Sequence, residues 1–129
     1  MSHNKALFFF GPENERLPAE DFVIRLPQGI QDKVGLLSHY AKAGQFPTYF
    51  GNNWDALNDC LRDFSWINKK NIIITHDDLP LLNDEKNLLV YLDILKDTLK
   101  HWKSSEQHTL LVMFPAKAEV IITRLLAKI

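Results

Sequence analysis

The stretch FPTYFGNNWDALNDCLRDF, residues 46–64, joins an aromatic turn to an acidic helix. The glycine and the two asparagines after the aromatic pair are typical of a turn. Either Asn52 or Asn53 can cap a helix that starts at Trp54. Asp55 then falls in the first turn, where the helix dipole favours a carboxylate. The segment therefore predicts a loop followed by a helix.

The two sides of this predicted helix differ in chemistry. At about 100° of rotation per residue, the apolar side, with Trp54 at its border, consists of Leu57, Cys60, Leu61 and Phe64. The opposite side consists of Asp55, Asp59 and Asp63. Like charges four residues apart oppose helix formation by a few tenths of a kcal/mol. The acidic row is typical of a solvated helix face or, beside exposed aromatic side chains, of a surface that binds a partner.

Length and composition limit the classes of function. The chain has 129 residues and a formal net charge of −1, which predicts one domain and argues against a general nucleic-acid binder. Cys60 is the single cysteine, so no internal disulfide forms, as suits a reducing compartment. We find no signal-peptide pattern and no apolar run long enough for a membrane span. We therefore expect a cytoplasmic protein that binds neither nucleic acid nor membrane. As a separate expectation, we take it to be monomeric when free.

Apolar runs and helical spacing predict a small α/β domain. Strands are expected at 6–10, 22–26, 71–75 and 109–114, and further helices at 31–43 and from 84 to about 102. This order predicts a three-stranded parallel sheet packed with helices, with the strand at 6–10 added at an edge. For residues 116–128 both a helix behind Pro115 and a strand through Val-Ile-Ile-Thr remain open.

The order of residues from Pro47 to Leu61 reads P-x-Y-F-G-x-N-x-D-A-L-x-D-C-L. This pattern resembles the barstar family of intracellular ribonuclease inhibitors, and the resemblance extends over most of the chain. It implies a two-layer barstar-like fold in a single domain, 1–129, in which 1–20 and 115–129 are additions to the compact core. It also implies a protein without catalysis, without a cofactor and without a metal.

The resemblance further implies an immunity-type inhibitor that blocks the active site of a basic extracellular or toxin-type ribonuclease. The helix and its loop would enter that active site, with Asp59 as the central carboxylate and Asp55 beside it, in place of RNA phosphates. The other residues of the expected binding surface are Tyr49, Gly51, Asn53, Trp54, Ala56 and Asn58.

Two alternative functions stay open. Relatives often have tryptophan where this chain has Asn58, and Arg62 adds a positive charge one turn later, which favours an adaptor with a different partner. A small metal-dependent enzyme is the second alternative. It would use His76, Asp77 and Asp78, because acids after a parallel strand often hold metal or phosphoryl groups. The structural alternative for these two acids is capping of the following helix.

Overall fold

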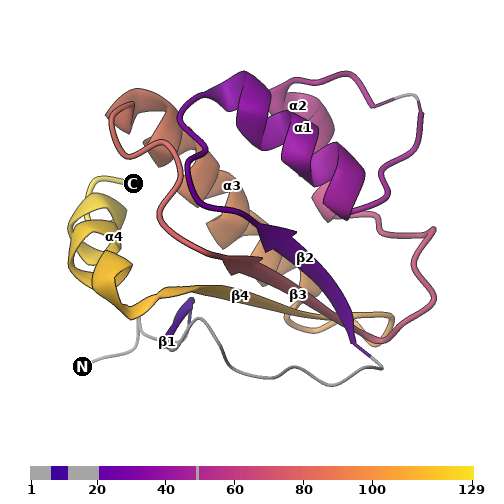
Figure 1. Ribbon diagram of the computed structural model, residues 1–129. Helices are drawn as coiled ribbons and strands as arrows, with labels where there is room; N and C mark the ends of the chain where they lie inside the picture. The colour runs from indigo at the N-terminus through magenta and orange to yellow at the C-terminus, as the bar shows by residue number, and fades with distance from the viewer. Residues whose placement is uncertain (1–6, 12–20, 49) are drawn as a thin grey trace.

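The computed structural model describes residues 7–11, 21–48 and 50–129 of the chain. All strands are parallel and lie in the order β1-β4-β3-β2. Helices α1, α2 and α3 lie on one side of the sheet, and α4 lies beside the end of β4 (Figure 1). The elements are β1 (Phe9–Gly11), β2 (Phe22–Leu26), α1 (Lys33–Ala43), α2 (Trp54–Leu61), β3 (Asn71–His76), α3 (Glu85–Trp102), β4 (Thr109–Pro115), η2 (Ala116–Ala118) and α4 (Glu119–Leu126).

Among the described residues the sheet has four strands rather than the expected three, because β1 joins it as a parallel neighbour of β4. Phe9 pairs with Met113, and Phe10 pairs with Phe114. The rings of Phe10 and Phe114 stack with their centroids 6.2 Å apart, which adds apolar contact to this short ladder. The edge position expected for the first strand is confirmed. The expected start of that strand at Ala6 lies outside the described residues.

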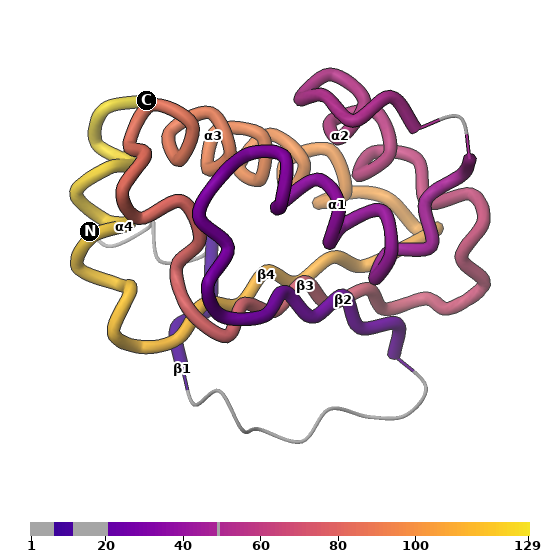
Figure 2. The backbone as a smooth tube through the Cα atoms, turned by 45° about the horizontal axis from the view of Figure 1, so that its top comes forward, coloured from indigo at the N-terminus to yellow at the C-terminus, as the bar shows by residue number. Residues whose placement is uncertain are grey.

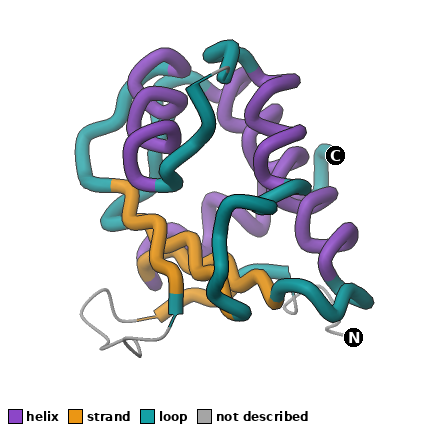
Figure 3. Tube along the Cα trace, turned by 90° about the vertical axis from the view of Figure 1, so that its right-hand side faces the viewer, coloured by secondary structure: helices purple, strands orange, loops and turns teal. Residues whose placement is uncertain are grey.

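The hydrophobic core lies between the sheet and the three helices, which Figure 3 shows on the same side of the strands. Ile24, Ile74 and Val112 are neighbours in the register of β2, β3 and β4, and all three are fully buried. Facing them are fully or almost fully buried residues of the helices: Leu36, Leu37 and Tyr40 of α1, Leu57 and Leu61 of α2, and Leu88, Tyr91, Leu92 and Leu95 of α3. Burying one such side chain stabilises a fold by about 1.5–3 kcal/mol.

Helix α1 begins at Lys33, two residues later than expected, because Asp32 is its N-cap. The Asp32 carboxylate accepts a hydrogen bond of 2.8 Å from Gly35 N. Although Val34 is apolar, it does not belong to the buried stripe of this helix, since its side chain is 71% exposed. The buried stripe of α1 is instead formed by Leu36, Leu37 and Tyr40.

The C-terminal tail is helical, so the strand alternative for residues 116–128 is wrong. Pro115 ends β4 instead of starting a helix, and the chain continues through η2 into α4. Ile122 and Leu125 of α4 are buried at helical spacing. The tail lies close to the start of α3 (Figure 2). There, Lys128 Nζ is 2.9 Å from the carboxylate of Glu85. The tail therefore forms a helix beside the start of α3.

Candidate protein-binding site on helix α2

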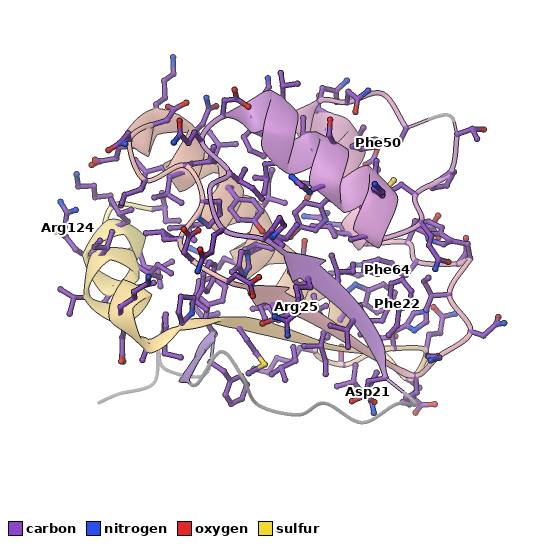
Figure 4. The ribbon with its side chains drawn as sticks, in the orientation of Figure 1. Asp21, Phe22, Arg25, Phe50, Phe64 and Arg124 are labelled. Carbon is purple, nitrogen blue, oxygen red and sulfur yellow. The ribbon has the colours of Figure 1, made fainter. Side chains whose placement is uncertain are left out.

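The loop in front of α2 folds back onto an aromatic cluster. Phe50 N donates a hydrogen bond of 3.0 Å to Pro47 O, which closes a turn. The half-buried ring of Phe50 meets the edge of Phe46 with the centroids 5.0 Å apart. Figure 4 shows Phe50 and Phe64 on the same side of the molecule. Tyr49, the expected aromatic contact, lies outside the described residues.

Asn53, one of the two expected candidates, caps α2. Its side-chain oxygen accepts a hydrogen bond of 2.7 Å from Ala56 N, and its side-chain nitrogen lies 3.4 Å from Gly51 O. In the turn before the cap, Asn52 has a left-handed backbone conformation, with φ of 54°. A side chain at Gly51 would bring a Cβ to 3.3 Å from the Asn53 amide, so glycine leaves room for the cap. This cap determines where Asp55 projects from the first turn.

The two carboxylates that the sequence placed at the centre of the site are both exposed on α2. Asp55 and Asp59 are one turn apart, and neither has an ion-pair or side-chain hydrogen-bond partner among residues 7–11, 21–48 and 50–129. Asp63 is also exposed, but α2 ends at Leu61, so the expected row of three acids on one helix is wrong. The helix therefore presents two hydrated anions, whose water can be replaced by cationic donors of a partner.

Trp54 lies between α1 and α3 and anchors the start of α2. Its indole Nε1 donates a hydrogen bond of 3.2 Å to Asn87 Oδ1, and its ring stacks on Tyr91 with the centroids 6.3 Å apart. Lys33 Nζ lies 5.8 Å from the centroid of the indole. The Asn87 amide also donates to the carboxylate of Asp84, and this hydrogen bond lowers the pKa of Asp84. The half-buried Trp54 thus supports the site, and its contact with a partner stays a prediction.

The end of α2 is held by Trp102 and His108, two side chains whose contacts with α2 the sequence did not predict. Trp102 Nε1 donates a hydrogen bond of 2.8 Å to Leu61 O. Phe64 follows the helix with φ of 48°, a left-handed conformation that stops it, and its ring is fully buried. The ring nitrogens of His108 lie 3.2 Å from Phe64 O and 2.9 Å from Lys69 O. Because both ends of α2 are held, its outer face is a rigid base for the carboxylates.

The remaining residues of the expected site lie on or beside the same helix. Ala56 and Asn58 are half-buried, and Arg62 is exposed at the C-cap. Cys60 is buried on the opposite side, as the helical pattern predicted. Burial raises the pKa of the Cys60 thiol, and the negative charges of Asp63 and Asp59 raise it further. Cys60 is therefore a protonated core residue and not a nucleophile.

His76, the first member of the alternative metal site, is a buried residue of β3. Its Nδ1 lies 2.7 Å from Met113 O, and its Nε2 lies 2.7 Å from the hydroxyl of Tyr91. That hydroxyl lies 2.6 Å from the hydroxyl of Tyr40. Because both ring nitrogens have protein partners, neither is available to a metal. Burial lowers the pKa of His76 to about 4, so the ring is neutral at pH 7.

Asp77 and Asp78 also have other roles. Asp77 forms an ion pair of 2.7 Å with Arg25 of β2, and Asp78 accepts a long hydrogen bond of 3.4 Å from Gly29 N. The expectation that one of them caps the next helix is wrong, because Asp84 is the N-cap of α3. Within the described part of the chain, no three His, Cys, Asp or Glu side chains are grouped so that they could hold a metal ion.

Comparison with known proteins agrees with this geometry. Residues 21–114 match the family model described as Barstar (barnase inhibitor). The chain belongs to the barstar family. No curated protein and no solved structure matches it. The family is one of inhibitors and not of enzymes. None of the described helices is long and apolar enough to cross a membrane.

The matched residues contain strands β2 and β3, all of β4 except Pro115, and helices α1, α2 and α3. They therefore contain the whole described part of the site. Strand β1 and helix α4 lie outside the match. The interpretation of residues 1–20 and 115–129 as additions to the compact core stays a prediction.

Proposed function

We propose that this barstar-family protein inhibits a basic ribonuclease of extracellular or toxin type in the cytoplasm of the cell that it protects. Helix α2 enters the active site of the enzyme, and Asp59 and Asp55 take the places of RNA phosphates. The observation that carries the proposal is the pair of exposed carboxylates, without partners among the described residues, on a helix held at both ends. Carboxylates accept charged hydrogen bonds from Arg and Lys much as phosphates do.

Two physical features of the site support this function. The helix is held in place by Trp54 and Trp102, so little conformational entropy is lost when it binds. The formal net charge of the chain is only −1, so attraction to a basic enzyme must come from the local field of α2. Asp55 and Asp59 supply this field at the surface that would enter the active site.

The test uses barnase, the enzyme named in the description of the family. Wild type is expected to bind and inhibit it, and Asp59→Ala is expected to weaken binding by roughly 10- to 100-fold, as for the loss of one or two charged hydrogen bonds. The free energy of unfolding should change by less than about 0.5 kcal/mol, because Asp59 is exposed.

The matched control is Asp93→Ala, which removes the same charge from an exposed position of α3. It should leave the affinity within about threefold of wild type, since exposed charges contribute little outside an interface. Equal binding by wild type and Asp59→Ala would refute the assignment of the site.

Ionic strength gives an independent readout of the same proposal. The association rate with barnase should fall as salt rises, because screening shortens the reach of the field around Asp55 and Asp59. The double variant Asp55→Ala/Asp59→Ala should show a flatter dependence than the Asp93→Ala control. An association rate of the wild type that does not respond to salt would contradict charge steering by α2.

An adaptor function is the second candidate, and Asn58 and Arg62 are the residues that favour it. The same surface would then bind a protein that is not a nuclease. A partner captured from a lysate by wild type, lost with Asp59→Ala and free of ribonuclease activity would decide for the adaptor. A captured ribonuclease would decide for the inhibitor.

A further inference from the structure

The side chain of Arg62 has no partner within the part of the chain that the structure describes. Arg62 is the exposed C-cap residue of α2, and its guanidinium takes part in neither of the two ion pairs found there, Arg25–Asp77 and Lys128–Glu85. Asp59 and Asp63 are close to it in sequence, yet neither pairs with it. An arginine at this position therefore has no internal salt bridge to explain it.

Stabilisation of the helix terminus is the ordinary explanation for a cation at this position. Here, however, other groups donate to the carbonyls of the last turn. Asn58 O accepts from Arg62 N, and Cys60 O accepts from the amides of residues 63 and 64. Leu61 O accepts from Trp102 Nε1. The guanidinium is thus not needed as a hydrogen-bond donor to these three carbonyls.

Arg62 lies on the same face of α2 as the two carboxylates. Its backbone is still helical, with φ of −94° and ψ of −2°, so its side chain continues the helical wheel. On that wheel it is about 20° from Asp55 and about 60° from Asp59. A partner that covers these acids therefore also meets the guanidinium, and the face carries a cation among anions.

We propose that the ribonuclease carries a carboxylate that pairs with Arg62 inside its cationic active site; this inference rests on the proposed function. A site that cleaves RNA needs cations for the phosphate and groups that move protons, and carboxylates are common among such groups. The planar guanidinium binds a carboxylate through two parallel hydrogen bonds. Arg62 thereby complements the acid of the active site, while Asp55 and Asp59 complement its cations.

The test measures binding to barnase by Arg62→Ala, Arg62→Lys and Arg124→Ala. If Arg62 meets a carboxylate, Arg62→Ala should weaken binding by roughly tenfold, mainly through faster dissociation, and Arg62→Lys should fall between Arg62→Ala and wild type. Arg124→Ala makes the same change of net charge on α4, on the side of the molecule away from Phe50 and its loop (Figure 4). This control should leave dissociation unchanged.

Each other outcome has a separate meaning. Equal or tighter binding by Arg62→Ala, with faster association, would overturn the inference, because the guanidinium would then only repel a basic enzyme. Weakening by Asp59→Ala in the same series would still support the proposed function. Absence of binding by wild type would overturn both. Circular dichroism melts of each variant exclude loss of fold as the cause.

Discussion

Lowering the pH from 7 to 5 is expected to destabilise this protein through His76. A carbonyl oxygen only accepts, so Nδ1 carries the proton that bonds Met113 O at 2.7 Å. Nε2 of the neutral ring then accepts from the Tyr91 hydroxyl, whose oxygen accepts from Tyr40. A second proton on this buried ring would disrupt the chain of hydrogen bonds and leave a charge without a counter-ion. Phe114, stacked 3.9 Å from the ring, and the two tyrosines supply no negative charge at this pH.

The sign and size of the effect follow from linkage between protonation and folding. The pKa of His76 is about 4 in the fold and 6.5 in the reference state, so the unfolded chain binds the proton first as the pH falls. Stability is complete above about pH 6.5 and is lost as the pH falls toward 4. These two values give a loss of about 2 kcal/mol between pH 7 and pH 5. Small domains are stable by only about 5–15 kcal/mol, so the loss is measurable.

The assay is urea unfolding followed by circular dichroism at pH 7, 6 and 5. Wild type should lose stability across this range, whereas His76→Gln, which cannot titrate, should be almost flat. Tyr91→Phe is the matched control, because it removes both hydrogen bonds of the Tyr91 hydroxyl, to His76 Nε2 and to the Tyr40 hydroxyl, but keeps the titratable imidazole of His76. It should be less stable at every pH, by about 1–3 kcal/mol, and should still lose stability on acidification.

Two outcomes would refute the reasoning. One is equal stability of the wild type at pH 7 and pH 5, and the other is an equal loss in His76→Gln. Asp84 and Glu85 do not produce the same effect in this window. The pKa values of Asp84 and Glu85 are lowered in the fold by hydrogen bonds from Asn87 and Lys128, so their contribution is lost mainly below pH 5.

Three further predictions concern the support of the site. Asn53→Ala removes the cap of α2 and should lower the free energy of unfolding by about 1 kcal/mol in a urea titration, whereas Asn53→Asp should retain most of it. Gly44→Ala should cost about 1–3 kcal/mol in the same assay, because the new Cβ would lie only 2.6 Å from the Phe46 ring and 2.9 Å from Tyr40 O; an unchanged midpoint would show that both the ring and the end of α1 adjust freely. Trp54→Phe removes the indole donor to Asn87 and should lower stability by about 0.5–1.5 kcal/mol in thermal melts, with faster hydrogen exchange in the first turn of α2.

Local sequence was sufficient to predict α2 and the exposure of its acids. The alternation of apolar and acidic residues at a period of 3.6, together with an asparagine before Trp54, involves residues within a few turns of each other. The same reasoning placed Cys60 and Leu57 in the core, which the structure confirms. It extended the acidic row to Asp63, because periodicity alone does not show where a helix stops.

Long-range contacts explain what sequence reasoning missed. Trp54 lies at the border of the helical wheel, and its burial depends on Asn87 and Tyr91, more than thirty residues away. The hydrogen bond from Trp102 to the end of α2 spans a similar distance along the chain, and no local sequence pattern in either segment predicts it. The acids after β3 illustrate the same limit, since Asp77 pairs with Arg25 on a neighbouring strand.

The sequence by itself determined the α/β class, the amphipathic helix α2 and the exposed position of Asp55 and Asp59, because these depend on periodicity and caps within short segments. Only the tertiary structure decided that the edge strand β1 pairs in parallel with β4, that the tail forms α4 and that His76 is neutral inside the core. The physical reason is that strand pairing, burial and the hydrogen-bond partners of a buried polar side chain such as His76 depend on residues distant in the chain. Helical periodicity carries no information about those residues.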